Sequence, residues 1–140
     1  MHMKKLFLFL ITVSLFCACQ PKLTEKVEVS FPNGQPQYVK ILDESGDCVR
    51  EVEYYETGQV KMEGPMKEGQ REGKWVAYFP DGRPQSIGDF KAGKMDGVTK
   101  VYWDNGNLRW EGFNKEDRRC GKWMFYDEQG LLLKEVDYGE

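Results

Sequence analysis

The sequence predicts an all-β fold, an elongated single-layer antiparallel meander built from 24-residue β-hairpin repeats. Three observations predict it. Glycines recur every 24 residues, at Gly34, Gly58, Gly82, Gly106 and Gly130. Tyrosines recur with the same step, at Tyr54, Tyr78, Tyr102 and Tyr126. Neither a helical heptad nor an alternation of strands and helices follows Cys19, so consecutive hairpins should pair side by side in one sheet.

Residues 1–18 are expected to be a lipoprotein signal peptide. Lys4 and Lys5 precede an apolar run over residues 6–16, which is shorter than the ~20 residues of a membrane-spanning helix. The run ends in Phe16-Cys17-Ala18-Cys19, which resembles the bacterial lipobox. The resemblance implies that Cys19 carries a diacylglyceryl thioether and a palmitate-type acyl chain. The alternatives are Cys17 as the acylated residue, a plain secretory signal cleaved nearby, or a short core helix.

The predicted lipid at Cys19 implies a membrane partner and a place in the cell envelope, at the outer membrane or the periplasmic face rather than in the cytoplasm. Cleavage would also remove His2, the one histidine in the sequence. A Ser-His or Cys-His nucleophile and a histidine metal site are then excluded. We therefore expect no enzyme activity, no cofactor, no metal and no catalytic residue. The net charge of −3 argues against a nucleic-acid partner.

Residues 19–30 are expected to form the lipidated cysteine and a tether, and residues 31–140 the repeat domain. A complete unit starts with an aromatic and β-branched run over residues 73–79 and turns at Pro80-Asp81-Gly82. It returns over residues 83–90 and ends in a loop with two glycines, Gly93 and Gly97. The first unit, around Phe31 to Gly34, keeps the turn but has lost the tyrosine, as a capping repeat would.

The combination of Gly73-Lys74-Trp75, Tyr78 and Asp81-Gly82 resembles the MORN-variant repeat of bacteria, over about residues 31–140. Proteins with this repeat are commonly labelled as an antitoxin family. The resemblance implies a repeat-sheet fold and leaves function open, because a repeat of this kind is a scaffold.

Alternation places Trp75 and Trp123, which are 48 residues apart, on one face and the recurring tyrosines on the other. The recurring glycines of the return strands should leave room for the rings, at Gly64, Gly88 and Gly112. Most of these rings are then the core of a thin sheet. Three aromatic residues lie outside the regular tryptophan and tyrosine positions and are the candidate binding residues, namely Tyr55, Trp103 and Trp110.

The sequence thus favours a non-enzymatic envelope lipoprotein whose repeat sheet binds another protein, of an antitoxin or immunity type, with a toxin as the partner. The alternative is a structural scaffold or spacer at the membrane. Cys48 and Cys120 lie 72 residues apart, which is three repeats, so we expect no disulfide between them.

Overall fold

The computed structural model describes residues 22–140. The predicted signal peptide and Cys19 lie outside the described residues. Eleven strands form the fold: β1 (Thr24–Ser30), β2 (Pro36–Leu42), β3 (Cys48–Tyr54), β4 (Val60–Lys67), β5 (Gln70–Arg71), β6 (Gly73–Tyr78), β7 (Pro84–Lys91), β8 (Lys94–Tyr102), β9 (Leu108–Lys115), β10 (Arg118–Tyr126) and β11 (Leu132–Asp137).

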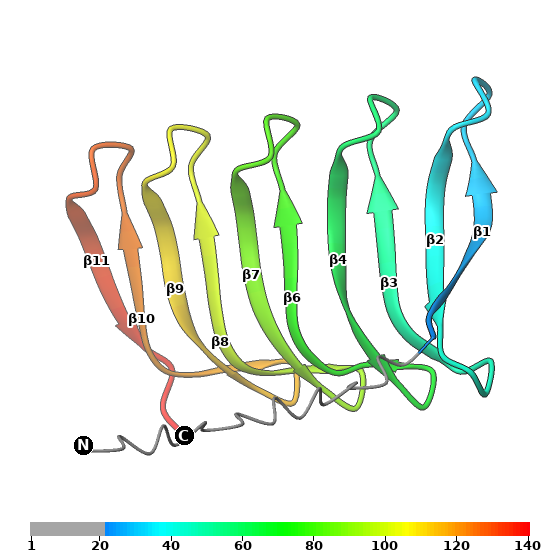
Figure 1. The fold of residues 1–140 in the computed structure, drawn as a ribbon. Helices are drawn as coiled ribbons and strands as arrows, with labels where there is room; N and C mark the ends of the chain where they lie inside the picture. The colour runs from blue at the N-terminus through cyan, green and yellow to red at the C-terminus, as the bar shows by residue number, and fades with distance from the viewer. Residues whose placement is uncertain (1–21) are drawn as a thin grey trace, which may run out of the picture.

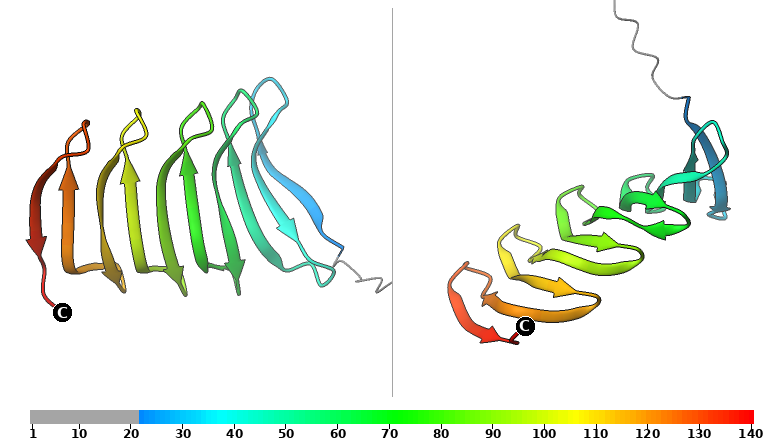
Figure 2. Two further views of the ribbon diagram at one scale, coloured as in Figure 1. Left: turned by 60° about the vertical axis from the view of Figure 1, so that its left-hand side comes forward. Right: turned by 90° about the horizontal axis from the view of Figure 1, so that it is seen from below.

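The strands form one antiparallel sheet in chain order, with the two-residue β5 pairing only with the end of β4. Five hairpins stand side by side, and β1 and β11 lie at its two ends (Figure 1). Each hairpin is rotated relative to the one before it, so the sheet twists along its length (Figure 2). The predicted single-layer meander of hairpin repeats is confirmed.

The upper turns of the hairpins are built alike because the 24-residue period places a glycine at the same position in each. In one of them the N–H of Gly82 donates to the carbonyl of Phe79 over 2.9 Å. Gly82 has φ +86°, a left-handed conformation that only glycine adopts readily. The side chain of Asp81 accepts a hydrogen bond from the N–H of Arg83 and closes the turn.

The described part of the chain begins to pair earlier than the sequence predicts. Residues 24–30, predicted as part of the tether, form β1 and pair with β2 from Thr24 opposite Leu42 to Ser30 opposite Pro36. Val27 and Val29 alternate with charged residues here, and such a pattern suits a strand at the edge of a sheet. The degenerate first unit is therefore a complete hairpin.

The sheet has two faces, and the strands curve at their lower ends (Figure 1). Arg71 and Phe90, from the curved ends, contact Trp75 of the upright part, so this face lies inside the bend. We call it the inner face. Its buried hydrophobic residues are Trp75 and Trp123, whereas those of the outer face are Val39 and Val52 at the β2–β3 end.

The outer face carries the recurring tyrosines beside charged residues. The hydroxyl of Tyr78 donates to Glu63 over 3.1 Å, and Glu63 also pairs with Arg50. The hydroxyl of Tyr126 makes the equivalent contact with Glu111, 48 residues further along the chain. Burial, followed by the charge of Glu63, raises the pKa of Tyr78 above its ordinary value.

Candidate functional site

On the inner face, a cluster of aromatic rings and an arginine, which we call an aromatic stack, occurs on every second hairpin. The first stack is built on Trp75 of β6. The ring of Trp75 lies over Gly64 so closely that a Cβ on that glycine would overlap it. Its indole N–H donates to the carbonyl of Pro65 over 3.0 Å. Phe90 packs edge-on against the ring, with centroids 6.2 Å apart, and the guanidinium of Arg71 lies 4.0 Å above it.

The same stack recurs on β10, 48 residues along the chain. The ring of Trp123 covers Gly112, and its indole N–H donates to the carbonyl of Phe113 over 3.2 Å. Tyr138 packs edge-on at 6.1 Å, and the guanidinium of Arg119 lies 4.4 Å from the ring centroid. The two stacks therefore match residue for residue.

The hairpin between them breaks the pattern. Thr99 occupies the tryptophan position and Asn114 the position of Phe90 and Tyr138. The two side chains are 3% and 4% exposed, and the Asn114 amide donates to the Thr99 hydroxyl over 2.6 Å. Met95 takes the position of the two arginines. A compact polar pair thus replaces a large aromatic stack.

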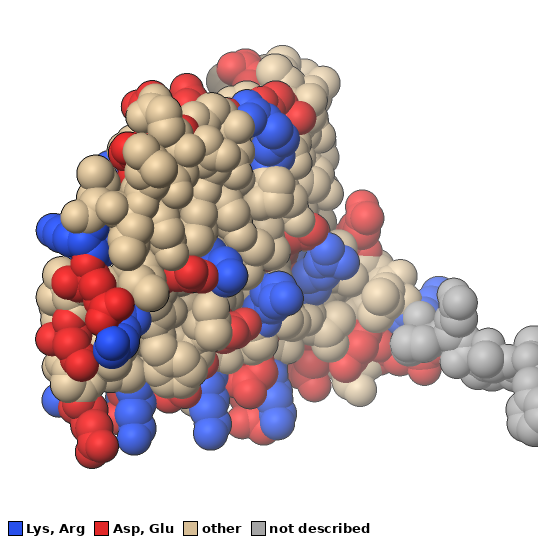
Figure 3. Space-filling model, turned by 90° about the vertical axis from the view of Figure 1, so that its left-hand side faces the viewer, with Lys and Arg blue, Asp and Glu red and all other residues tan. Residues whose placement is uncertain are grey.

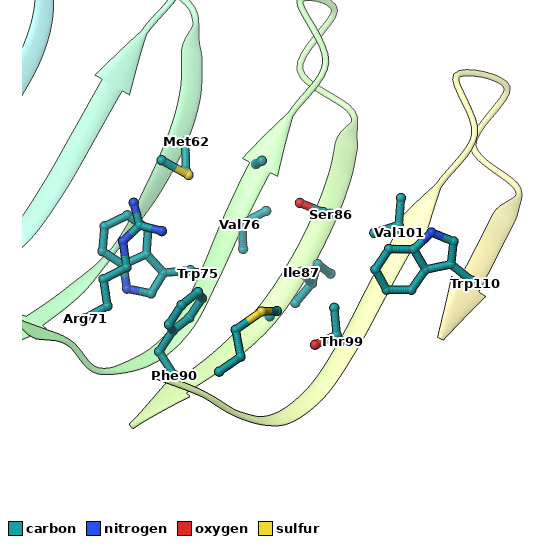
Figure 4. A pocket seen from close by; sticks show the side chains of 13 residues that line it. Met62, Arg71, Trp75, Val76, Ser86, Ile87, Phe90, Thr99, Val101 and Trp110 are labelled. Atoms are coloured by element: carbon teal, nitrogen blue, oxygen red, sulfur yellow. The ribbon is translucent and has the colours of Figure 1, made fainter. Parts of the chain in front are cut away.

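A hollow lies on the inner face where this aromatic stack is missing (Figure 4). Gly88, at its floor, is not overlapped by a ring; a Cβ there would lie in ordinary van der Waals contact with the Met95 methyl at 3.5 Å and with the ring edge of Phe90 at 3.6 Å. The cavity has a volume of about 210 Å³. Its lining is mostly apolar and comes from β4 to β9: Met62, Arg71, Trp75, Val76, Ala77, Ser86, Ile87, Gly88, Phe90, Met95, Thr99, Val101 and Trp110.

The size of the hollow limits what it can hold. Small-molecule and cofactor sites usually enclose about 300–1,000 Å³, whereas this cavity has about 210 Å³. That volume suits one large side chain of another protein. Aromatic and apolar anchors seated in such hollows contribute much of the affinity of protein interfaces.

Two of the predicted binding residues link neighbouring hairpins at the turn end. The hydroxyl of Tyr55 donates to the carbonyl of Tyr78 over 2.7 Å. The indole N–H of Trp103 donates to the carbonyl of Tyr126 over 3.2 Å. Both residues are half-buried and link one hairpin to the next, and no sequence pattern predicts these bonds.

Trp110, the third predicted binding residue, lies on the inner face and not with the other two. Its ring packs on Trp123 with centroids 5.3 Å apart, and the residue forms one wall of the hollow (Figure 4). Sequence reasoning missed Thr99, Gly88 and Met95 as site residues. The repeat does show that Thr99 stands in a tryptophan position. Whether this substitution creates a hollow depends on the direction in which the neighbouring tryptophan rings lean.

Cys48 begins β3 and Cys120 lies in β10, and both are free thiols. Burial raises the pKa of the Cys48 thiol, which opposes formation of a reactive thiolate. Within residues 22–140, no cluster of three or more His, Cys, Asp or Glu side chains could hold a metal ion. Over the same residues, no helix combines the length and apolarity needed to cross a bilayer.

Two carboxylates at the curved end, those of Glu72 and Asp117, accept hydrogen bonds from backbone N–H groups, and neither residue lines the hollow. Glu72 accepts from the N–H of Ala92, and Asp117 accepts from the N–H of Met95, each over 2.8 Å. Acidic and basic side chains alternate along the lower edge of the molecule in the view toward β11 (Figure 3). The carboxylates of Glu72 and Asp117 are therefore engaged with backbone groups of the sheet itself.

Comparison with known proteins supports the repeat assignment. The profile of the MORN repeat variant matches residues 49–68, 71–92 and 95–112. No curated protein sequence matches the chain significantly. A chain in the "Crystal structure of GtfA/B complex bound to UDP and GlcNAc" is similar, with a TM-score of 0.47 and 18% identity over 94% of this chain and 26% of that one. This chain thus spans about a quarter of the length of that structure.

MORN repeats are generally protein-binding or membrane-binding repeats, and the repeat is a non-enzymatic module. The three matched segments run from β3 into β9 and include all the residues that line the hollow. The MORN repeat variant is thus found over three repeats within residues 49–112, and further hairpins continue the sheet on both sides of them.

Proposed function

We propose that this chain is a non-enzymatic binding module that holds one apolar side chain of a partner protein in the hollow of its inner face. The observation that carries the proposal concerns one repeat position on the inner face. Trp75 and Trp123 occupy it in two hairpins, and the smaller Thr99 occupies it in the hairpin between them, beside the hollow. A preformed sheet loses little conformational entropy when it binds.

The test fills the hollow with residues that the repeat already uses. In Thr99→Trp with Asn114→Phe, the introduced indole should cover Gly88, as Trp75 covers Gly64. In Ser86→Met, β7 receives the residue that β4 has in the same repeat position, Met62. Circular dichroism checks that each variant is folded.

The full chain and both filled variants are then used to capture partners from membranes of the native host. We expect a stoichiometric protein with the wild type and its loss with both filled variants. A partner captured equally by the filled variants would place binding elsewhere. If no stoichiometric partner is found, the scaffold or spacer function is favoured instead.

We further propose that the module is a lipoprotein of the cell envelope, acylated at Cys19. Thr24 begins the sheet five residues after Cys19, so an extended chain would place the β1 end of the sheet within roughly 17 Å of the lipid. Mass spectrometry of the N-terminal peptide, with Cys19→Ser as the control, tests the acylation. An unmodified Cys19 would overturn it.

An immunity role against a toxin that reaches the envelope is the most specific form of the proposal. Its support is the antitoxin label given to proteins with similar repeats and the predicted anchor at Cys19. A binding module of this kind would inhibit a toxin by covering it. Co-expression with a secreted toxin encoded beside this chain should protect the cell, and the absence of both protection and complex would end the idea.

A further inference from the structure

Two arginines flank the hollow, one on each aromatic stack. The guanidinium of Arg71 lies 4.0 Å from the Trp75 ring, and that of Arg119 lies 4.4 Å from the Trp123 ring. Among residues 22–140, neither arginine forms an ion pair with a carboxylate. Arg119 makes one hydrogen bond, to the hydroxyl of Tyr138. A guanidinium that lies flat on a ring still directs its N–H groups sideways.

The lining of the hollow offers no carboxylate to balance this positive charge. None of the residues that line the hollow is acidic, and Arg71 is the charged one among them. The nearby carboxylates of Glu72 and Asp117 already accept hydrogen bonds from backbone N–H groups. Carboxylates supplied from outside are therefore the groups that complement the two arginines.

The spacing of the arginines indicates how long the ligand segment is. Arg71 of β5 lies over Trp75 of β6, and Arg119 belongs to β10. From β6 to β10 there are four strand steps, which corresponds to roughly 19 Å. An extended peptide rises about 3.3 Å per residue, so about six residues span that distance. The hollow lies between the two arginines, beside the midpoint of the segment.

We propose that the partner contributes an extended acidic segment, with one aromatic or large aliphatic residue for the hollow and a carboxylate about three residues to each side of it. The central side chain enters the position left open by Thr99, and the carboxylates bind Arg71 and Arg119. This inference rests on the proposed function, because it identifies the chemistry of the partner for the same face.

The probe for the test is a displayed library of random twelve-residue peptides, selected against the full chain in detergent micelles. We expect the enriched peptides to contain one central apolar residue with Asp or Glu on both sides. Their affinity should fall about tenfold for each arginine replaced in Arg71→Gln and Arg119→Gln, since each substitution removes a charge-assisted hydrogen bond.

The matched control is Arg83→Gln with Arg109→Gln. These two arginines also lie over aromatic rings, Phe79 and Trp103, but away from the hollow. This double control makes the same change in net charge as Arg71→Gln combined with Arg119→Gln, and it should leave binding unchanged. Binding should also weaken with added salt in the wild type, and less so in the Arg71 and Arg119 variants.

The outcomes separate this inference from the proposed function. The selected peptides could lack acidic residues, bind both arginine variants as tightly as the wild type and fail to bind Ser86→Met. That result would refute the acidic segment and would leave the proposed binding face in place. Peptides that bind the filled variants equally well, or an absence of enriched peptides, would overturn both. A dimer that dissociates on Ser86→Met would show a second copy as the occupant and overturn a foreign acidic segment.

Discussion

Two glycines in the same repeat position should respond in opposite ways to the same substitution. Gly112 and Gly88 both lie within strands, and neither has a left-handed φ, so alanine is compatible with the backbone at both. At Gly112 a Cβ would overlap the ring of Trp123. At Gly88 the nearest atom to a Cβ would be the Met95 methyl, at 3.5 Å, which is ordinary van der Waals contact.

The magnitude follows from these surroundings. In Gly112→Ala the ring of Trp123 must move, although it is 1% exposed. Overpacking of this kind destabilises by about 1–3 kcal/mol. The upper limit is the loss of the buried tryptophan, about 3–5 kcal/mol. In Gly88→Ala no atom must move, and replacing glycine within a strand stabilises by about 0.5–1 kcal/mol.

Urea unfolding followed by far-UV circular dichroism measures the difference. Repeats unfold as coupled neighbours, so the midpoints of complete curves are compared. We expect Gly112→Ala to lower the midpoint and Gly88→Ala to leave it unchanged or raise it. Gly64→Ala, beneath Trp75, should behave as Gly112→Ala does. Equal destabilisation at Gly88 and Gly112 would refute the argument that Thr99 leaves a space.

Three further predictions concern the bonds between and within hairpins. Tyr55→Phe should lower the free energy of unfolding by about 0.5–1.5 kcal/mol in urea titrations, because it removes the hydrogen bond to the Tyr78 carbonyl. The ring itself is kept, and Phe79 occupies the same repeat position, 24 residues further along. An unchanged free energy of unfolding would mean that the hydrogen bond is absent in solution. Asn114→Leu should lower the free energy of unfolding by about 1–3 kcal/mol, because it leaves the buried Thr99 hydroxyl without its hydrogen-bond partner. Adding Thr99→Val should recover part of that loss. Losses that simply add in the double variant would contradict the pairing. The Tyr78 hydroxyl has a pKa above its ordinary 10.0 in the folded chain, so its contribution to stability is complete below pH 10 and is lost as the pH rises through the folded value. Unfolding midpoints between pH 9 and 11 should therefore fall less steeply in Tyr78→Phe than in the wild type, and equal slopes would refute this.

The 24-residue period was sufficient to predict the sheet, since each glycine turn and tyrosine strand depends on residues close together in the chain. The turn glycines recur every 24 residues from Gly34 to Gly130, and each has the positive φ that a tight turn between two strands requires. The start of β1 was missed because Val27 and Val29 form a short edge strand with charged neighbours, a weak pattern by itself.

The site was harder to predict because it depends on where rings lean. Gly64, Gly88 and Gly112 look equivalent in the sequence, and we expected each to make room for a ring. Trp75 and Trp123 lean back over the preceding hairpin and cover the first and third of these glycines. No ring overlaps the Cβ position of Gly88, because Thr99 stands where the covering tryptophan would be. This difference between the glycines can be predicted only when the direction of the rings is known.

The roles of two half-buried aromatic residues, Tyr55 and Trp103, could not be predicted from the sequence either. Tyr55 and Trp103 differ from the regular pattern and looked like contact residues. Each spans to the next hairpin and donates to a backbone carbonyl there. A bond between residues 23 positions apart follows from the pairing of hairpins in space, and no local pattern in the sequence announces it.

The occupancy of the hollow can be measured directly by methyl NMR with 3-methylindole, which mimics a tryptophan side chain. On titration into the full chain in micelles, we expect shifts confined to methyl groups that line the hollow, those of Met62, Met95 and Val101, with Val39 and Val52 unaffected. These shifts should disappear in Ser86→Met. Shifts that persist in that variant, or that spread over both faces of the sheet, would contradict a binding position created by Thr99.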